Sequence, residues 1–398
     1  MHIESLLDMD FYKLTMGQFV FEHFPKVQIK YEFKSRASFH LSPFVNFSKL
    51  HAQLEHCRGL RFTPPEIAYL RSLGFFSENY LRFLENFQLL PYRLDSCDGN
   101  IILEFAGPWH QQIYWETIAL SIVNGIYFDG QSVDYDYAIG SLKRKVDVLS
   151  GFPEIKFSDF GTRRRLSRSW HSRVIEEVRH LPGFIGSSNV YQSMLLNRPP
   201  VGTLAHELMM VSTALEIQHS KEDKWRKENL ITATRDLLTN WETMYGSFRS
   251  IALTDTYGSD IFFDQIFAHV ARTYAGVRQD SGDPFKFGYE AINFYDSHGI
   301  DPTEKTIVFS DGLELKTIVD LFHQFKGKVR PAFGWGTNLT NDTNIAPISI
   351  VIKPTEADGQ PCVKLSDNIA KATGNRIAVE NYKRFLGYAA KTHEACKY

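Results

Sequence analysis

Seven short apolar runs in the middle of the chain constrain its fold more than any other feature. Helical apolar periodicity follows several of these runs, at Ser167–Leu181, Lys221–Tyr245, Phe285–Ser297 and Leu313–Phe325. Strands that alternate with helices pair in parallel, and about seven such units close into a barrel more readily than into a flat sheet. We therefore predict an irregular TIM-like α/β barrel. The runs lie near residues 155–159, 184–187, 200–203, 251–254, 275–279, 306–310 and 329–333.

The two ends of the chain lack this alternation. The N-terminal segment predicts a helix over Met9–Phe24, a strand over Gln28–Lys34 and a hairpin between Tyr92 and Ala106 that turns at Asp98-Gly99-Asn100. The C-terminal segment predicts two strands, at Ile348–Lys353 and Pro361–Leu365, with no crossover helix between them. We expect a barrel domain over 111–344 and a second α/β domain over 1–110, completed by 345–398. Further helices are predicted at Pro64–Leu73, Ser77–Phe87, Gln112–Asn124 and Tyr135–Leu149.

Composition limits the classes of function. A formal net charge of -2 argues against a general nucleic-acid or membrane-surface binder, because such proteins usually carry a basic excess. No apolar stretch approaches bilayer length, and the N-terminus carries acidic residues where a signal peptide would carry a positive leader. The four cysteines form no CxxC pair, which indicates neither a structural zinc site nor a disulfide framework. We expect a cytoplasmic protein.

The segment FSDFGTRRRL, residues 157–166, combines a carboxylate, an aromatic face and three arginines. Phe160 can stack on a planar ring, while the guanidinium groups of Arg163 and its neighbours can bind carboxylate or phosphate oxygens. Taken alone, such an arginine run is more often the solvated start of a helix. With a turn glycine after an expected strand, it favours a site for a planar anionic small molecule.

Every expected strand of the barrel runs directly into a polar motif. Any one motif is explained as a helix cap or a turn. In a barrel, however, loops at the C-terminal ends of the strands carry the functional groups, so seven polar motifs in series predict an active site there. The motifs are SDFGTRRR, GSSNVYQS, GTLAHE, TDTYGSD, RQDSGDP, SDGLE and FGWGTNLTND.

The last two motifs predict phosphate binding. They contain Asp311-Gly312 and Gly334-Trp335-Gly336-Thr337, and barrels commonly bind phosphate through glycine-backed N–H groups after their final strands. The dinucleotide fingerprint GxGxxG fails because position 339 is leucine, and no P-loop motif is present. Neither a Rossmann cofactor nor a P-loop nucleotide is predicted.

Four aspartates in neighbouring motifs are candidate magnesium ligands. Asp255, Asp260, Asp280 and Asp283 could hold Mg²⁺ through water, because this ion prefers a few carboxylates together with substrate phosphates. Helix capping is the alternative, and Asp283, which precedes a proline, is the clearest case.

His206 follows Gly202-Thr203 at the end of an expected strand. The sequence HELMM is not the zinc motif HExxH, because position 210 is methionine. A loop histidine of this kind is a surface residue, a general base, or a nucleophile that forms phosphohistidine. The sequence pattern leaves these three roles open.

Together these motifs resemble the nicotinate phosphoribosyltransferases, over essentially the whole chain. The resemblance rests on DFYKLTMGQ, FSDFGTRRR, GSSNV, GTLAHE, ALTDTYGSD, GVRQDSGDP, FSDGLE and FGWGTNL. It implies an irregular α/β barrel with a separate α/β domain, assembled as a homodimer with shared sites. It also implies that nicotinate and phosphoribosyl pyrophosphate (PRPP) give nicotinate mononucleotide and pyrophosphate in Preiss-Handler salvage to NAD. ATP hydrolysis through a phosphohistidine would drive this reaction, with Mg²⁺ as cofactor, as in a carbon-nitrogen ligase.

The resemblance also assigns roles to single residues. Phe160 matches the aromatic that stacks on the pyridine ring, and Tyr12 matches one that reaches in from the partner subunit. His206 matches the phosphorylated histidine. The remaining matches are Arg163 and Arg278 beside base and PRPP, Asp255 and Asp280 near ribose and metal, Asp311, Gly312, Gly336 and Thr337 in the 5′-phosphate loops, and Arg36 as a basic residue offered across the dimer.

The choice of base depends on Ser188 and Asn189. Nicotinamide enzymes of the same superfamily have an acidic residue at the position of Ser188, and an unpaired carboxylate there would repel the charge of nicotinate. Because both residues are neutral, we predict that they bind nicotinate rather than nicotinamide. The alternatives are a nicotinamide or quinolinate phosphoribosyltransferase, a non-catalytic barrel that binds a phosphate ligand, and a sugar-phosphate isomerase.

Overall fold

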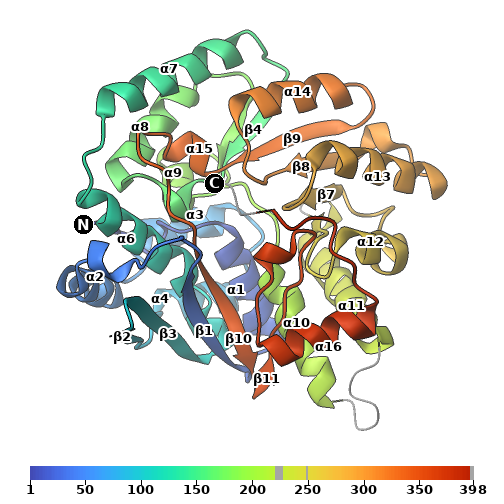
Figure 1. Ribbon diagram of the computed structural model, residues 1–398, viewed down its shortest axis with the longest axis horizontal. Coiled ribbons are helices and arrows are strands. Elements are labelled where there is room, and N and C mark those ends of the chain that lie inside the picture. The colour runs from blue at the N-terminus through green and yellow to red at the C-terminus, as the bar shows by residue number, and fades with distance from the viewer. Residues whose placement is uncertain (220–226, 248–249, 395–398) are drawn as a thin grey trace. The chain divides into compact units, whose positions relative to one another are not determined.

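The computed structural model describes residues 1–219, 227–247 and 250–394 (Figure 1). Its contacts divide the chain into two compact units. The first unit comprises Met1–Gly202 and Gly334–Lys353, and the second comprises Thr203–Phe333 and Pro354–Lys397. The predicted domains, 1–110 with 345–398 and 111–344, divide the chain at other places and stay a prediction.

The first unit begins with the predicted helix, strand and hairpin. Helix α1 (Tyr12–His23) precedes β1 (Gln28–Ser35), and β1 pairs antiparallel with β3 (Asn100–Pro108). The hairpin joins β2 (Arg93–Cys97) to β3, with Cys97 opposite Asn100. Asp98 and Gly99 form its turn with φ of 49° and 75°, as a two-residue hairpin turn requires. These predictions are confirmed.

Two predicted helix starts in the first unit are also confirmed. Helix α3 (Pro64–Ser72) begins with a capping box of Thr63 and Glu66, and α4 (Glu78–Glu85) begins after Ser77, whose Oγ accepts from the backbone N–H of Tyr80. The first unit also contains α2 (Phe47–Gly59), α5 (Trp109–Gln112), α6 (Trp115–Asp129), α7 (Tyr135–Ser150), α9 (Val190–Leu195), α15 (Thr337–Thr340), and the 3₁₀ turns η1 (Ser42–Phe44) and η2 (Thr162–Arg164).

A parallel strand pair carries the arginine segment. Strand β4 (Lys156–Asp159) pairs with β5 (Phe184–Ser187), and α8 (Arg168–Val178) connects them. The predicted strand at 200–203 is wrong, because these residues are irregular. Pro199 and Pro200 remove two N–H donors at its start, which interrupts a strand ladder, although the backbone N–H of Val201 donates to the oxygen of Ser187 in β5 at 3.0 Å.

The second unit contains β6, β7, β8 and the start of β9, up to Phe333, which pair in parallel in this order. Gly276 of β7 lies opposite Thr306 of β8, which in turn lies opposite Arg330 of β9. The predicted alternation of strands and helices is confirmed here, although part of the helix predicted from Lys221 lies outside the described residues. The bounds are β6 (Ile251–Leu253), β7 (Gly276–Gln279), β8 (Thr306–Phe309), β9 (Arg330–Trp335), α10 (His206–His219), α11 (Lys227–Tyr245), α13 (Pro284–Ser297) and α14 (Leu315–Phe325).

The C-terminal segment is less regular than predicted. Strand β10 (Ile350–Ala357) turns back into β11 (Gln360–Pro361). Of the predicted strand Pro361–Leu365, β11 contains the first residue, Pro361. Beyond it Lys364 forms an isolated bridge with Thr373. The other elements of the second unit are α12 (Ser259–Ile261), the π-helix η4 (Phe262–Ile266), the 3₁₀ turns η5 (Phe267–His269), η6 (Pro302–Glu304) and η7 (Ile369–Lys371), and α16 (Arg376–Leu386). Within the described ranges, no helix has both the length and the apolar character that crossing a bilayer demands.

Candidate active site

His206 is the first residue of α10 and is only 4% exposed. The sequence interpretation placed it in a loop at the end of a strand, and both parts of that interpretation are wrong. The preceding residues 200–205 are irregular, and the histidine itself begins the helix. A surface role is therefore excluded, and the ring must be explained by its buried neighbours.

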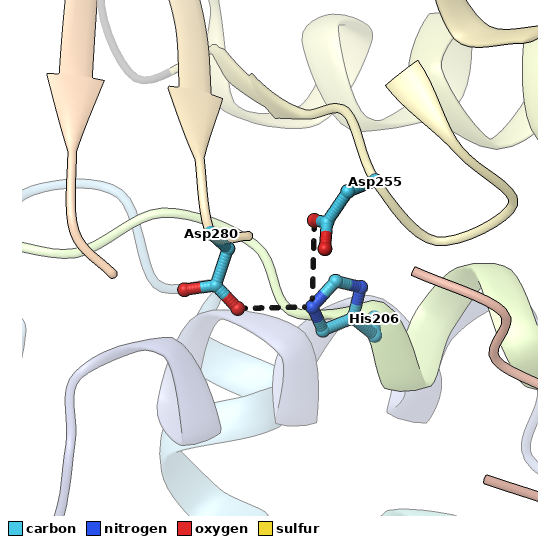
Figure 2. Close-up of side chains that lie close together, drawn as sticks. All are labelled: His206, Asp255 and Asp280. Carbon is cyan, nitrogen blue, oxygen red and sulfur yellow. Dashed lines mark hydrogen bonds and ion pairs between the residues drawn. The ribbon is translucent and has the colours of Figure 1, made fainter. Parts of the chain in front are cut away.

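Three charged side chains approach the same ring nitrogen of His206. Nε2 lies 3.1 Å from Oδ2 of Asp280, 2.8 Å from Nζ of Lys364 and 3.7 Å from Oδ1 of Asp255. Figure 2 shows the two carboxylates pointing toward this nitrogen from different segments. The other nitrogen, Nδ1, lies 3.0 Å from Oγ1 of Thr256. We call His206, Asp255, Asp280 and Lys364 the histidine cluster.

The parallel strands explain why the two aspartates meet. Asp280 directly follows β7, and Asp255 follows β6 by two residues; β6 and β7 are parallel neighbours, so their carboxyl ends lie at one edge of the sheet. Oδ2 of Asp255 accepts hydrogen bonds from the hydroxyls of Ser281 (2.5 Å) and Ser366 (2.9 Å). These bonds fix the carboxylate beside the histidine.

Asp280 is held from its other side by Arg278. Its Oδ1 accepts from Nη2 of Arg278 at 2.7 Å and from the Ser310 hydroxyl at 3.1 Å, and Nη1 of Arg278 donates to Oγ1 of Thr203 at 3.1 Å. Thus GTLAHE, TDTYGSD, RQDSGDP and SDGLE, four of the predicted motifs, converge within the second unit.

The charge state of the histidine cluster follows from burial and pairing. The pKa of His206 is lowered to about 4, because burial and the Lys364 ammonium both lower it and the two carboxylates only partly offset this. Although burial raises the pKa of Asp280, Arg278 and His206 hold it well below its usual range. A neutral imidazole therefore lies between ionised carboxylates and a lysine. This is the protonation state in which a histidine can act as a nucleophile.

We predict that His206 stays neutral from pH 8 to pH 5.5. Because its pKa is lowered from 6.5 to about 4, protonation begins only when the pH falls toward 4. Titration of protein labelled with ¹³C-histidine, followed by NMR, measures this directly, and the His206→Asn variant identifies the signal by its loss. A midpoint near 6.5 for that signal would contradict the prediction.

A second lysine binds the predicted phosphate loop. Nζ of Lys371 lies 2.5 Å from Oδ1 of Asp311 and donates to the backbone oxygen of Asp280 at 3.0 Å. Gly312 has a φ of 56°, a conformation that glycine adopts without strain. Burial raises the pKa of Asp311, and Lys371 partly offsets this. The predicted pair Asp311-Gly312 is therefore joined to the histidine cluster through Lys371.

The sequence interpretation missed Lys364 and Lys371. Both come from the C-terminal segment, which was expected to complete the N-terminal domain. One signal was available, since Lys364 interrupts the apolar run CVKL, where a charge is costly unless it is paired.

Asp260 and Asp283 do not join the histidine cluster. Asp283 caps α13 by accepting from the backbone N–H groups of Phe285 and Lys286, which is the alternative that its position before proline indicated. Asp260 is largely exposed and pairs with Lys391 at 2.8 Å. Of the four candidate magnesium ligands, the structure brings together only Asp255 and Asp280.

In the first unit, Phe160 and Arg163 lie in one loop after β4. The half-buried ring of Phe160 fits because position 334 is glycine: a Cβ there would lie 2.4 Å from Cε2 of the ring. Nε of Arg163 lies 3.4 Å from Oδ2 of Asp10, and its guanidinium carbon lies 5.9 Å from the ring centre of Tyr12. Tyr12 and Arg163 are thus neighbours within one chain.

The other predicted residues of the first unit lie at element ends. Arg36 follows β1, and its backbone N–H donates to the oxygen of Ser349 at 2.7 Å. Gly336 precedes the single-turn helix α15, whose first residue is Thr337, and a Cβ at Gly336 would lie 3.4 Å from the backbone oxygen of Phe160. The phosphate loop containing Gly336 and the aromatic loop therefore lie against each other.

Ser188 and Asn189 differ in what they can offer a ligand. Asn189 is fully buried; its amide nitrogen donates to Asp8 at 2.7 Å, and its oxygen caps α9. Its side chain therefore shapes the loop. The hydroxyl of Ser188 donates to Oδ1 of Asp10 at 2.7 Å. The carboxyl group of Asp10 thus lies beside Ser188. The prediction of nicotinate over nicotinamide considered only Ser188 and Asn189 and did not include this group.

Asp10 is a carboxyl group with opposing influences. Burial raises its pKa and the Asp159 carboxylate adds to this, whereas Arg163 and the hydroxyl of Ser188 lower it. Because Arg163 pairs with Asp10, the positive charge of its guanidinium balances the negative charge that an ionised Asp10 would place beside Ser188.

The roles of the other two arginines follow from their partners. Arg165 is 1% exposed and forms a bidentate ion pair with Asp8, at 2.6 and 2.8 Å. Its guanidinium therefore does not face solvent. Arg164 is half-buried and donates to the backbone oxygen of Ile350 at 3.3 Å. The two arginines hold the segment to the fold.

Two ranges of the chain that contain the predicted motifs match one protein family. Residues 155–390 match the nicotinate phosphoribosyltransferase (NAPRTase) family, and residues 7–124 match the N-terminal domain of the same family. This chain belongs to the nicotinate phosphoribosyltransferase family. All the site residues predicted above lie within these two matched ranges.

Relatives in this family cover nearly the whole chain. The nicotinate phosphoribosyltransferase of Ralstonia nicotianae is 38% identical, covering 92% of this chain and 94% of its own, and that of Ralstonia pickettii is 37% identical with the same coverage. Among solved structures, the enzyme from Vibrio cholerae matches with a TM-score of 0.87 and 31% identity, over 98% of this chain and 94% of its own. The enzyme from Porphyromonas gingivalis matches with a TM-score of 0.88 and 28% identity, over 97% and 100%. The mixed α/β fold is thus that of this family.

Proposed function

We propose that this chain is a nicotinate phosphoribosyltransferase that converts nicotinate and PRPP into nicotinate mononucleotide and pyrophosphate in NAD salvage. The observation that carries this proposal is the histidine cluster: a buried neutral histidine between two carboxylates and a lysine, in a member of this family. Relatives that bear the name of this activity match the chain over almost its full length.

The residues of the second unit suit the chemistry of this reaction. The pyridine nitrogen forms a bond to C1 of the ribose while the bond from C1 to the pyrophosphate oxygen breaks, and positive charge develops on the sugar. Asp255 and Asp280 are carboxylates that can stabilise such charge, and Arg278 and Lys371 are cations suited to phosphate oxygens. Because no covalent help is needed, positioning supplies most of the rate.

His206 is the proposed site of phosphorylation by ATP. Its neutral Nε2 would attack the γ-phosphorus, forming the N–P bond as the bond to ADP breaks. Nζ of Lys364, 2.8 Å from Nε2, would offset the charge of the transferred group. Hydrolysis of the phosphohistidine would return the histidine and couple ATP to nucleotide formation.

The chain's residues fit Mg²⁺ through carboxylates rather than through the histidine. Ligand atoms of His206, Asp255 and Asp280 lie within 4.8 Å of one another, but the Lys364 ammonium is close to Nε2, and Mg²⁺ prefers oxygen ligands. Oδ1 of Asp255 is buried and accepts no hydrogen bond from the described residues. We propose that Asp255 and Asp280 hold Mg²⁺, which when bound neutralises charge on the pyrophosphate leaving group.

The first unit supplies the proposed base-binding residues. Phe160 would stack on the pyridine ring, and Arg163 would pair with the carboxylate of nicotinate. We propose a cytoplasmic homodimer with shared sites, to which Arg36 contributes across the dimer. The role of Tyr12 in the partner's site stays a prediction, since Tyr12 contacts Glu116 and Arg163 of its own chain.

We predict that Ser188→Asp lowers kcat/KM for nicotinate by about tenfold or more. The new carboxylate would lie beside Asp10 and would attract Arg163 away from nicotinate. Ser188→Asn is the matched control, because it adds similar volume without charge, and it should have a smaller effect. Equal kcat/KM for the Asp and Asn variants would show that charge at this position does not matter.

Parallel assays of three bases test the proposed function. With PRPP, Mg²⁺ and ATP, nicotinate should give the highest kcat/KM of nicotinate, nicotinamide and quinolinate, and EDTA should abolish turnover. A preference for nicotinamide or quinolinate would assign the chain to the corresponding alternative. Binding of PRPP without turnover of any base would indicate a non-catalytic barrel, and isomerisation of a sugar phosphate without ATP or PRPP would indicate an isomerase.

A further inference from the structure

Glu116, a buried residue of α6, contacts Tyr12 and Arg163, two residues that were predicted to act in base binding. Oε2 of Glu116 lies 2.7 Å from Nζ of Lys13 and accepts a hydrogen bond from the Tyr12 hydroxyl at 3.1 Å. Its Oε1 lies 2.9 Å from Nζ of Lys353 and 4.0 Å from Nη1 of Arg163. One carboxylate thus joins the start of α1, the loop after β4 and strand β10, all within the first unit.

The charges around Glu116 require it to be ionised. The side chain of Glu116 is 3% exposed and that of Lys13 is fully buried, so burial of either charge would destabilise the fold unless the charge were paired. Burial alone would raise the pKa of Glu116, but Lys13, Lys353 and Arg163 hold it well below its usual range. The ionised carboxylate of Glu116 therefore lies among three cations and reduces the repulsion between them.

Glu116 also restricts Arg163, which is proposed to pair with nicotinate, and Tyr12, which is predicted to reach into the partner's site. The hydroxyl of Tyr12 donates to Oε2 of Glu116. Nζ of Lys13 and Cζ of Arg163 lie 5.4 and 5.9 Å from the centre of the Tyr12 ring. Arg163 has two carboxylates beside it, those of Asp10 and Glu116. The directions of the aromatic ring and the guanidinium are thereby coupled through one buried group.

We propose that Glu116 is a positioning residue for base binding, which fixes Tyr12 and Arg163 without touching the substrate. The inference rests on the proposed function, and it applies whichever subunit's base these residues serve. Because a preorganised pair loses less freedom on binding, the effect of Glu116 should appear mainly in KM for nicotinate.

The Glu116→Gln variant tests this inference. It keeps the size of the side chain and removes its charge, and we expect KM for nicotinate to rise about tenfold with a smaller change in kcat. Glu104→Gln is the matched control, since Glu104 on β3 also pairs with two cations, Lys30 at 3.2 Å and Arg93 at 3.3 Å, on a more exposed face. The control should leave KM and kcat unchanged.

A gentler variant and a second readout separate positioning from damage to the fold. Tyr12→Phe removes the hydroxyl that donates to Glu116 and keeps the ring, and combining it with Glu116→Gln should raise KM by less than the product of the two single effects. Labelling of the protein by γ-labelled ATP should remain normal in Glu116→Gln. An unchanged KM, an equal effect in Glu104→Gln, or lost labelling would overturn the inference. If the unmodified protein does not use nicotinate, the proposed function fails instead.

Discussion

Exchange of His206 for asparagine is expected to abolish the acid-labile label that γ-labelled ATP leaves on the protein. Asparagine keeps a polar side chain beside Thr256 but has no nitrogen nucleophile, so no N–P bond can form. We expect at least a hundredfold loss of label, together with loss of the ATP stimulation of nucleotide synthesis. Protein-bound radioactivity before and after acid treatment measures the label.

His180→Asn is the matched control for this experiment. The side chain of His180 is 74% exposed and belongs to the first unit, so its loss should leave the label unchanged. A label that persists in His206→Asn would place the phosphoryl group on another residue. Loss of label in both variants would show that the change to asparagine acts through the fold.

Exchange of Asp280 for asparagine should lower kcat/KM for nicotinate by about 10² to 10³. This carboxylate is bound by Arg278 at 2.7 Å and lies 3.1 Å from Nε2 of His206, so its neutralisation removes the negative charge that pairs with Arg278 and a ligand proposed for Mg²⁺. Steady-state assays with nicotinate and PRPP, at saturating Mg²⁺, measure the loss.

Asp283→Asn provides a control three residues away in the same motif. Asp283 caps α13, and asparagine is about as good a cap as aspartate, so activity should stay within about twofold of the original. If Asp280→Asn also stayed within that range, the histidine cluster would not be the centre of the reaction.

Local sequence chemistry predicted much of the fold. The turn Asp98-Gly99, the helix start after Thr63, and the cap at Asp283 are short-range features that depend on neighbouring residues alone. Parallel pairing of strands also followed from their alternation with helices. It predicted correctly that Asp255 and Asp280, at the ends of β6 and β7, would meet at one edge.

The rest of the candidate site depends on contacts between segments far apart in the chain. Lys364 reaches His206 across 158 positions, and Lys353 reaches Glu116 across 237, so no spacing rule could have paired them. Spacing also cannot tell which acid at a strand end faces inward. Asp260 and Asp280 each lie within a polar motif that contains serine, glycine and two aspartates, yet Asp260 is exposed and Asp280 binds Arg278.

Proline chemistry accounts for the error at His206. The run at 200–203 looked like a strand from its apolar residues, but Pro199 and Pro200 interrupt a ladder, and the chain enters α10 directly. The motif GTLAHE nevertheless lies where a strand-end motif would be expected, because Arg278 binds Thr203 and Asp280 approaches His206.

Product analysis of a reaction run with and without ATP tests the central proposal most directly. Nicotinate, PRPP and Mg²⁺ are incubated with the protein, with and without ATP, and the products are separated and identified by mass. We expect equal amounts of nicotinate mononucleotide and pyrophosphate, with more of both when ATP is present and ADP is released. Absence of nicotinate mononucleotide in both mixtures would contradict the proposed function.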